Sequence, residues 1–388
     1  MYFLLLTFPL FVISYKLIDH NIQGEIAPGW EFVSDLFRDN FIKDRDLGAS
    51  VAIYHQGKPV VSLTGGWFDE SKTKPYDSAA LQIVFSTSKG IVAAAVALAV
   101  QRGLLDYSAL VTDYWPEYGQ NGKENTTVSD ILSHRAGVPD VSASYEDYLD
   151  WTKMIHKLEQ QSPAWLPGTA HNYHPLTYGW LAGELIRRVD RKRRSLGEFV
   201  HDEISSPSNF EFYIGLPSTQ EHRVSPLEFN QITKDFQNAS LDESISFFND
   251  ARLHQAEVPA ANGITNAWSV ARFYALLIGD VDDGKYQRII NEDILKVATK
   301  SNTPYVELDS VSQSSISFGM GFMNFDRILP RLGSGSFGHF GAGGSIGLAA
   351  PAYNLSFAYV MNRLDATVAG LNNRIEPILT KVAEELNQ

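Results

Sequence analysis

Apolar residues recur with helical spacing in two segments of the chain. In the first, Phe32, Leu36 and Phe37 fall on one face of a helix, which we expect to span about residues 28–45. The second segment, residues 91–100, is rich in alanine and apolar on every side. A helix without a polar face has to be buried, so this segment predicts a core helix.

Strand-like patterns flank the helical region on both sides. Residues 49–54 and 59–63 are separated by a short turn, and they predict a β-hairpin that starts an antiparallel sheet. Strand patterns return near the end, at residues 345–349 and 355–361. A final helix is expected from about Ala366 to the C-terminus.

The order of these elements predicts a mixed α/β (α+β) fold. We expect one domain over residues 28–388, in which an antiparallel β-sheet is flanked by helices and a mostly helical lobe is inserted. The α/β lobe would comprise about residues 28–85 and 255–388, and the helical lobe about residues 90–250. No internal repeat or low-complexity linker divides the chain.

Charge and composition exclude several kinds of function. The formal net charge of -13 argues against nucleic acid as a partner, because phosphates attract basic surfaces. None of the 388 residues is cysteine, which removes disulfides, thiolate metal sites and cysteine nucleophiles together. Because 44% of the residues are hydrophobic, the chain can form a sizeable packed core.

Residues 1–22 form an apolar N-terminal segment whose first charged side chain is Lys16. Its length suits a signal peptide or an anchor better than a membrane-spanning helix, so membrane association through this segment stays open. We expect entry into the secretory pathway; the alternative is an intracellular or mitochondrial location. The basic run at residues 187–194 is expected to be a solvated helix end, with contact to anionic lipid as the alternative.

The segment Ser86-Thr87-Ser88-Lys89 directly precedes the predicted core helix. Ser86 would lie at the helix N-terminus, with Lys89 one turn later on the same face. A serine hydroxyl becomes an effective nucleophile when a base removes its proton, and a lysine in a dry site can be that base. Alone, these residues also fit a helix cap and a solvated lysine. The apolar helix behind them favours a catalytic pair.

Two later segments add candidate site residues. Tyr173 is followed by His174-Pro175 and lies shortly after a Pro-Gly turn. Farther on, His339-Phe340-Gly341-Ala342 belongs to a glycine-rich stretch, where the backbone can approach a bound carbonyl closely. Taken singly, a buried structural tyrosine and a loop histidine are the alternatives.

In this order, the three motifs resemble those of the β-lactamase-related serine hydrolases. That family includes class C β-lactamases, D-alanyl-D-alanine peptidases, family VIII-type esterases and the eukaryotic LACTB-like proteins. The likeness runs from about residue 28 to the end and implies a β-lactamase/transpeptidase-like fold. It also implies that Ser86 is the nucleophile and that Lys89 and Tyr173, the latter as phenol or phenolate, carry protons.

The resemblance further implies an edge strand beside the site, in which His339 and Gly341 occupy the places of the Lys-Thr-Gly motif. The backbone N–H groups of Ser86 and Ala342 would form the oxyanion hole. No metal or organic cofactor is implied. His134 and Arg135 belong to a segment that recurs in the esterase and LACTB-like branches, and we interpret both as structural.

One further serine has to be weighed as a nucleophile. Ser345 lies in Gly-x-Ser-x-Gly, the pattern of the α/β-hydrolase nucleophile elbow, which requires a strand before the serine and a helix after it. The residues that follow Ser345 are extended and apolar instead. Ser345 is therefore predicted to be a sheet residue.

Two departures from the family pattern concern the substrate. Pro175 stands where antibiotic-hydrolysing relatives often have asparagine, and His339 stands where they have lysine. A mostly neutral histidine attracts a carboxylate less than lysine does. We therefore predict a carboxylesterase-like serine hydrolase acting on a small-molecule ester or amide. The alternatives are a catalytically weak binding or assembly protein of the LACTB-like type, and a true β-lactamase or D-Ala peptidase.

Overall fold

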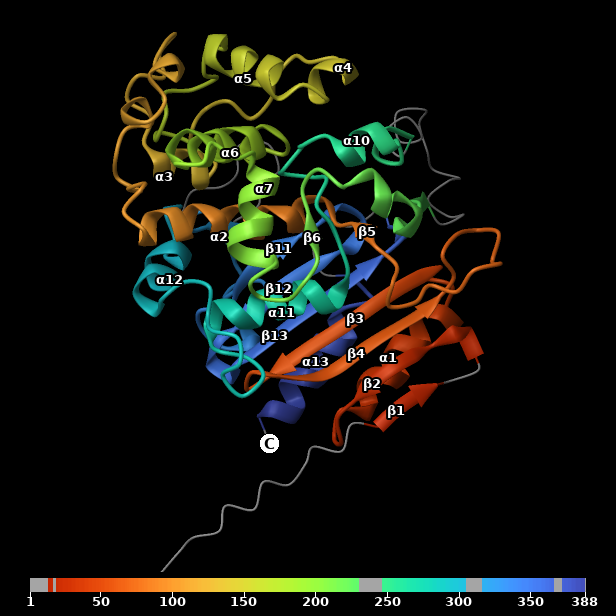
Figure 1. The fold of residues 1–388 in the computed structure, drawn as a ribbon. Helices are drawn as coiled ribbons and strands as arrows, with labels where there is room; N and C mark the ends of the chain where they lie inside the picture. The colour runs from red at the N-terminus through yellow and green to blue at the C-terminus, as the bar shows by residue number, and fades with distance from the viewer. Residues whose placement is uncertain (1–12, 17–18, 230–245, 305–315, 366–371, 388) are drawn as a thin grey trace, which may run out of the picture.

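The centre of the molecule is a nine-stranded sheet, seen in a computed structural model that describes residues 13–16, 19–229, 246–304, 316–365 and 372–387 (Figure 1). Every neighbouring pair in it is antiparallel, in the order β1-β2-β4-β3-β13-β12-β11-β10-β9. The strands are β1 Ile13–Lys16, β2 Gln23–Ile26, β3 Gly48–His55, β4 Lys58–Gly66, β9 Ser317–Phe318, β10 Met323–Asn324, β11 Phe337–Phe340, β12 Ile346–Ala350 and β13 Leu355–Met361. The predicted mixed fold with an antiparallel sheet is confirmed.

A strand from the N-terminal part of the chain pairs with one from the C-terminal part at the centre of this sheet. Strands β3 and β4 form the predicted hairpin. β13, from the C-terminal part, pairs with β3 along its whole length, with Leu355 opposite His55 and Met361 opposite Ala49. The strands at the start and the end of the sequence therefore belong to one layer.

Helices cover both faces of the sheet and form a separate group above it (Figure 1). They are α1 Glu31–Ile42, α2 Ser88–Gln101, α3 Val128–Leu132, α4 Tyr145–Tyr148, α5 Trp151–Gln160, α6 Thr177–Val189, α7 Leu196–Val200, α10 Ala251–Gln255, α11 Ala267–Ile278, α12 Glu292–Thr299 and α13 Glu376–Leu386. Alternate residues of β3 serve the two faces: Val51 and Ile53 pack in the core that includes α1 and α13, whereas Ala52 and Tyr54 pack in the core that includes α2 and α11.

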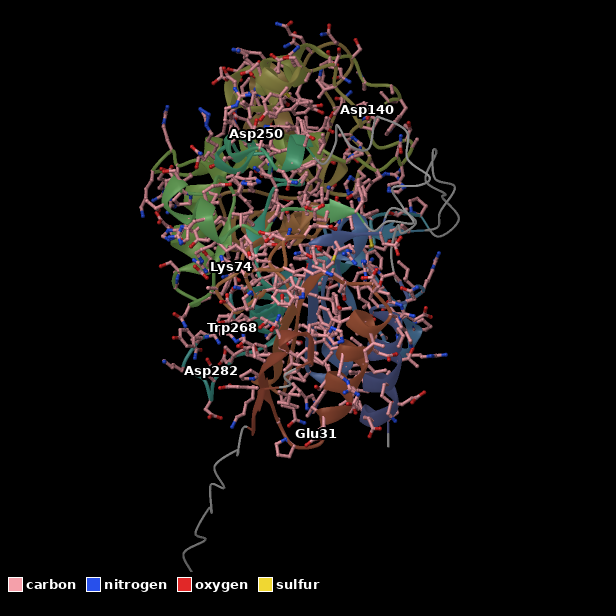
Figure 2. All side chains as sticks on the ribbon, turned by 90° about the vertical axis from the view of Figure 1, so that its right-hand side faces the viewer. Glu31, Lys74, Asp140, Asp250, Trp268 and Asp282 are labelled. Carbon is pink, nitrogen blue, oxygen red and sulfur yellow. The ribbon has the colours of Figure 1, made fainter. Side chains whose placement is uncertain are left out.

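The middle part of the chain forms the group of helices at the end of the molecule opposite α1. In Figure 2, Asp140 and Asp250 lie in this upper half, and Glu31 lies at the other end. Helix α2 connects the two halves, and each of its residues from Ser88 to Ala99 is buried. The prediction that this apolar segment is a core helix is confirmed.

The predicted start of the final helix is wrong by about ten residues. Helix α13 begins at Glu376, with Pro377 in its first turn. Proline suits that position, since its fixed φ is helical and its missing N–H has no partner to lose there. Residues 366–371, where the helix was expected to begin, lie outside the described part of the chain.

The N-terminal part of the sheet begins before the predicted boundary at residue 28. β2 pairs with β4, and β1 pairs with β2 at the edge of the sheet. Since β1 comprises Ile13–Lys16, it lies within the segment interpreted as a signal peptide or anchor; residues 1–12 lie outside the described chain. Within the described ranges, no helix is long and apolar enough to cross a membrane.

Two arginines of the basic run pair with carboxylates rather than pointing into solvent. Arg188 donates from Nε to Glu184 and from Nη1 to Glu117, over 2.8 Å and 2.7 Å. Arg194 is buried and lies 3.0 Å from Asp190 and 2.7 Å from Glu203. The interpretation of the whole run as a solvated helix end is therefore wrong for these two side chains, which tie the end of α6 to its neighbours.

Candidate active site

Ser86 lies in a short 3-10 turn, Phe85–Thr87, that leads directly into α2. Phe85 has a φ of 45°, a conformation that costs energy for an aromatic residue and therefore needs support from its surroundings. The Ser88 hydroxyl provides it by donating to the Phe85 carbonyl over 2.5 Å and accepting from the Gly263 N–H over 3.0 Å. Between residues 80 and 99 only Ser86 is not buried, so this turn presents its hydroxyl.

Lys89 is fully buried and in contact with Ser86, as the spacing predicted. Its Nζ lies 3.0 Å from Ser86 Oγ, 2.7 Å from the Pro175 carbonyl oxygen and 3.0 Å from that of Ala260. Burial lowers the pKa of Lys89 well below the usual value. A neutral amine has two N–H groups and one lone pair. If the two carbonyls take the N–H groups, the lone pair faces the Ser86 hydroxyl, as a general base requires.

Tyr173 completes a three-residue cluster from the loop before α6. Lys89 Nζ lies 4.8 Å from the centre of its ring. Burial raises the pKa of the Tyr173 phenol, although its hydrogen bond with Ser86 opposes that shift. The phenol therefore keeps its proton at neutral pH. Of the two forms of Tyr173 left open by the resemblance, burial therefore favours the phenol.

His339 lies on β11 and is buried, and its neutral ring is hydrogen-bonded to the backbone of the next residue. Its Nδ1 lies 2.7 Å from the Phe340 carbonyl oxygen, so Nδ1 carries the proton. Burial lowers the pKa of His339 to about 3, and a positive charge on the nearby Lys89 amine acts in the same direction. A histidine held neutral cannot attract a carboxylate by charge. Its ring centre is 6.0 Å from that of Tyr173, so the structure does bring it to the cluster.

The strand that carries His339 differs from the expected edge strand. β11 pairs with β12 on one side and with β10 on the other. However, β10 reaches only Phe337 and Gly338, and His339 and Phe340 lie beyond that pairing. β9 occupies the edge of the sheet instead. Among the described residues, His339 and Phe340 of β11 therefore have a strand neighbour on one side only, which is β12.

Gly341 brings the end of β11 against the turn that holds Ser86. A Cβ built on Gly341 would lie 2.2 Å from the Val84 carbonyl oxygen, which only a glycine avoids. Ala342 follows as the exposed first residue of its own 3-10 turn. In both turns the early N–H groups have no acceptor inside the turn, so those of Ser86 and Ala342 can each serve a ligand oxygen.

We expect Gly341→Ala to impair the protein because the new methyl group meets backbone. Overpacking of this kind costs about 1–3 kcal/mol, and displacing the strand end should lower kcat by roughly 10-fold or more. Thermal unfolding and ester kinetics measure both effects. Gly279→Ala is the matched control, since Gly279 has an extended φ of -172° and its nearest neighbour lies 4.0 Å from the built Cβ. Equal behaviour of the two variants would contradict the close packing described here.

Ser345 was predicted to be a sheet residue, and it lies one position before strand β12, at the end of the turn Ala342–Gly344. It is buried, and its hydroxyl lies 3.7 Å from the sulfur of Met361. Strand β12 follows it, so the helix that a nucleophile elbow needs is absent at this place.

Sequence reasoning missed the groups that hold Lys89. The carbonyls of Pro175 and Ala260 give no signal, because every residue has a carbonyl and their placement depends on the fold. Within the described ranges, no group of three or more His, Asp or Glu side chains is arranged to hold a metal ion.

Comparisons with known proteins find relatives that are similar over nearly the whole chain. The family model described as Beta-lactamase matches residues 34–378. The protein Esterase/beta-lactamase LipL of Mycobacterium tuberculosis is 31% identical over 369 residues, which cover 89% of this chain and 83% of that protein. A family VIII carboxylesterase structure superposes with a TM-score of 0.85 at 32% identity, covering 94% of this chain and 99% of the other. A penicillin-binding protein homologue from Caulobacter crescentus gives 0.81 at 32% identity, covering 93% and 99%.

Proposed function

This chain belongs to the β-lactamase family of serine hydrolases, and we propose that it is a carboxylesterase-like member working through a Ser-Lys-Tyr acyl-enzyme mechanism. Enzymes of this kind act on esters or amides. The single observation that carries the mechanism is the contact set of the buried Lys89 amine, which lies between two carbonyl acceptors and Ser86 Oγ.

In the first half of the reaction, Ser86 Oγ attacks the carbonyl carbon of the ester and its proton passes to Lys89 Nζ. The negative charge that develops on the carbonyl oxygen is held by the N–H groups of Ser86 and Ala342. When the intermediate collapses, the C–O bond to the leaving group breaks. The Tyr173 hydroxyl protonates the departing alcohol and is reprotonated from Lys89.

In the second half, water attacks the Ser86 acyl ester. Lys89 Nζ accepts the one proton that this water loses, while Tyr173 remains a phenol, and the N–H groups of Ser86 and Ala342 again hold the charge on the carbonyl oxygen. Collapse returns the proton to Ser86 Oγ and releases the carboxylic acid. The burial of Lys89 supports this role, because burial lowers the pKa of the amine and a general base has to be unprotonated in the resting enzyme.

The substrate class rests on the groups that flank the cluster. His339 is neutral, and Pro175 offers a backbone carbonyl to Lys89 but no side-chain amide to a substrate. Both features favour a neutral acyl group over one that carries a carboxylate. The similarity to a family VIII carboxylesterase, spanning nearly the whole of both chains, supports the same choice.

A substrate panel tests this proposal. We expect p-nitrophenyl esters of short acyl chains to be turned over with a kcat/KM at least about 10-fold above that for the cephalosporin nitrocefin or a D-alanyl-D-alanine peptide, a ratio worth about 1.4 kcal/mol. The Ser86→Ala variant provides the background rate. A preference for nitrocefin or the peptide would identify a β-lactamase or peptidase instead. No turnover by folded wild-type protein would support a binding or assembly role of the LACTB-like type.

A further inference from the structure

The loop that carries Tyr173 is held from both sides by one residue of a different segment. His134 is fully buried in the turn after α3. Its backbone carbonyl accepts from the Asn172 N–H over 3.2 Å, and its ring Nδ1 accepts from the His174 N–H over 3.0 Å. The two residues on either side of Tyr173 are thus bonded to the same partner.

The ring of His134 also forms one wall of the space that Tyr173 occupies. Its centre lies 4.7 Å from the centre of the Tyr173 ring and 4.5 Å from that of Phe318. Phe318 in turn stacks on Tyr173 at 5.9 Å. The three rings are therefore mutual neighbours, and Lys89 Nζ lies over the face of the tyrosine ring.

Two properties allow His134 to hold the loop in this way. Its φ is 63°, in the left-handed region where asparagine and histidine are enriched among non-glycine residues, and this conformation turns its carbonyl and its ring toward the same loop. Burial lowers the pKa of His134, and the neighbouring histidines and Lys89 lower it further. The ring stays neutral, so its Nδ1 remains an acceptor for the His174 N–H.

We propose that His134 is a positioning residue of the active site: by bonding the backbone on both sides of Tyr173, it sets the distance of the phenol from Lys89 and Ser86. This inference rests on the proposed Ser-Lys-Tyr function. The role goes beyond support of the fold, because His134 binds the N–H groups of Asn172 and His174, and a displacement of either residue moves the phenol between them. His134 itself does not touch the reacting atoms.

Three substitutions separate the parts of this contact. His134→Asn keeps an acceptor on a short side chain and a residue that tolerates positive φ. His134→Gly keeps the backbone conformation but loses the acceptor and the ring wall. His134→Leu loses both the acceptor and the tolerance of positive φ. His20→Gly controls for the exchange of a histidine for glycine at positive φ, since His20 has a φ of 61° and is exposed between β1 and β2.

The expected result is a change in kcat without a matching change in KM. For His134→Gly we expect kcat for p-nitrophenyl esters to fall on the order of 10- to 100-fold, because small displacements of a catalytic group have effects of this size. KM should change by less than about threefold, and His134→Asn should restore most of the rate. The kinetics of His134→Leu are compared with those of His134→Gly once thermal unfolding has shown that the leucine variant is folded.

A second readout does not depend on catalysis. Protein labelled with 3-fluorotyrosine is studied by ¹⁹F NMR, and the Tyr173 signal is identified by its loss in Tyr173→Phe. We expect this signal to shift or broaden in His134→Gly, and to stay close to wild type in His134→Asn and His20→Gly. If wild-type protein hydrolyses no ester but the signal responds in this way, the proposed function fails and the positioning role stands. An unchanged signal and an unchanged kcat in folded His134→Gly would overturn the positioning role.

Discussion

Replacing Ser86 with alanine is expected to reduce kcat/KM for p-nitrophenyl esters by at least about 10⁴-fold, because loss of a nucleophile removes the covalent route altogether. The fold should persist, since Ser86 is the one position of its segment that is not buried and its turn is held by Ser88. Steady-state kinetics and thermal unfolding on the same preparation measure both quantities.

Ser345→Ala is the matched control for this variant. The Ser345 hydroxyl is buried against the Met361 sulfur, so its replacement removes only one weak contact. We expect an activity within about threefold of wild type, as for substitutions outside the catalytic machinery. A large loss in Ser345→Ala together with retained activity in Ser86→Ala would reverse the assignment of the nucleophile.

Replacing Lys89 with methionine is expected to lower kcat by about 10²- to 10⁴-fold, the range that a general base contributes. Methionine keeps the length of the side chain but has no amine to accept the Ser86 proton. In the wild type, kcat/KM should rise with pH as Lys89 loses its proton, with a midpoint below the ordinary lysine pKa of 10.5. The pH profile of the residual activity of Lys89→Met should lack this transition.

The same variant should change how stability depends on pH. The folded state lowers the pKa of Lys89, so the unfolded chain binds more protons at this position and the free energy of unfolding rises with pH up to about 10.5. Lys89→Met removes this contribution. The melting temperature of Lys89→Met relative to that of the wild type should therefore be highest at neutral pH and should decrease toward alkaline pH. A difference in melting temperature that does not change with pH over this range would contradict a lowered pKa of Lys89.

Much of the site geometry could be predicted because local periodicity determines it. The spacing of Ser86 and Lys89 places them one helical turn apart, and the apolar helix behind them explains why the lysine is dry. Tyr173 and His339 were placed beside them through resemblance rather than periodicity, since nothing local in either segment says which other segment it meets.

Other features of the fold and the site depend on contacts between distant segments, and the local sequence does not predict them. β2 was missed because Gln23-Gly24-Glu25 lacks an apolar alternation, and its pairing with β4 creates the strand. The acceptors of the Lys89 amine are main-chain carbonyls, whose positions cannot be predicted from the type of side chain. His134 was interpreted as structural; its bonds to both neighbours of Tyr173 become visible only when the two segments are folded together.

The most direct test of the central claim is to locate a covalent adduct. The wild type, Ser86→Ala and Ser345→Ala are treated with a fluorophosphonate, and the modified peptide is identified by mass spectrometry. We expect one adduct per chain, on the peptide that contains Ser86, in the wild type and in Ser345→Ala, and none in Ser86→Ala. An adduct that survives in Ser86→Ala, or one found on Ser345, would contradict the assignment of Ser86 as the nucleophile.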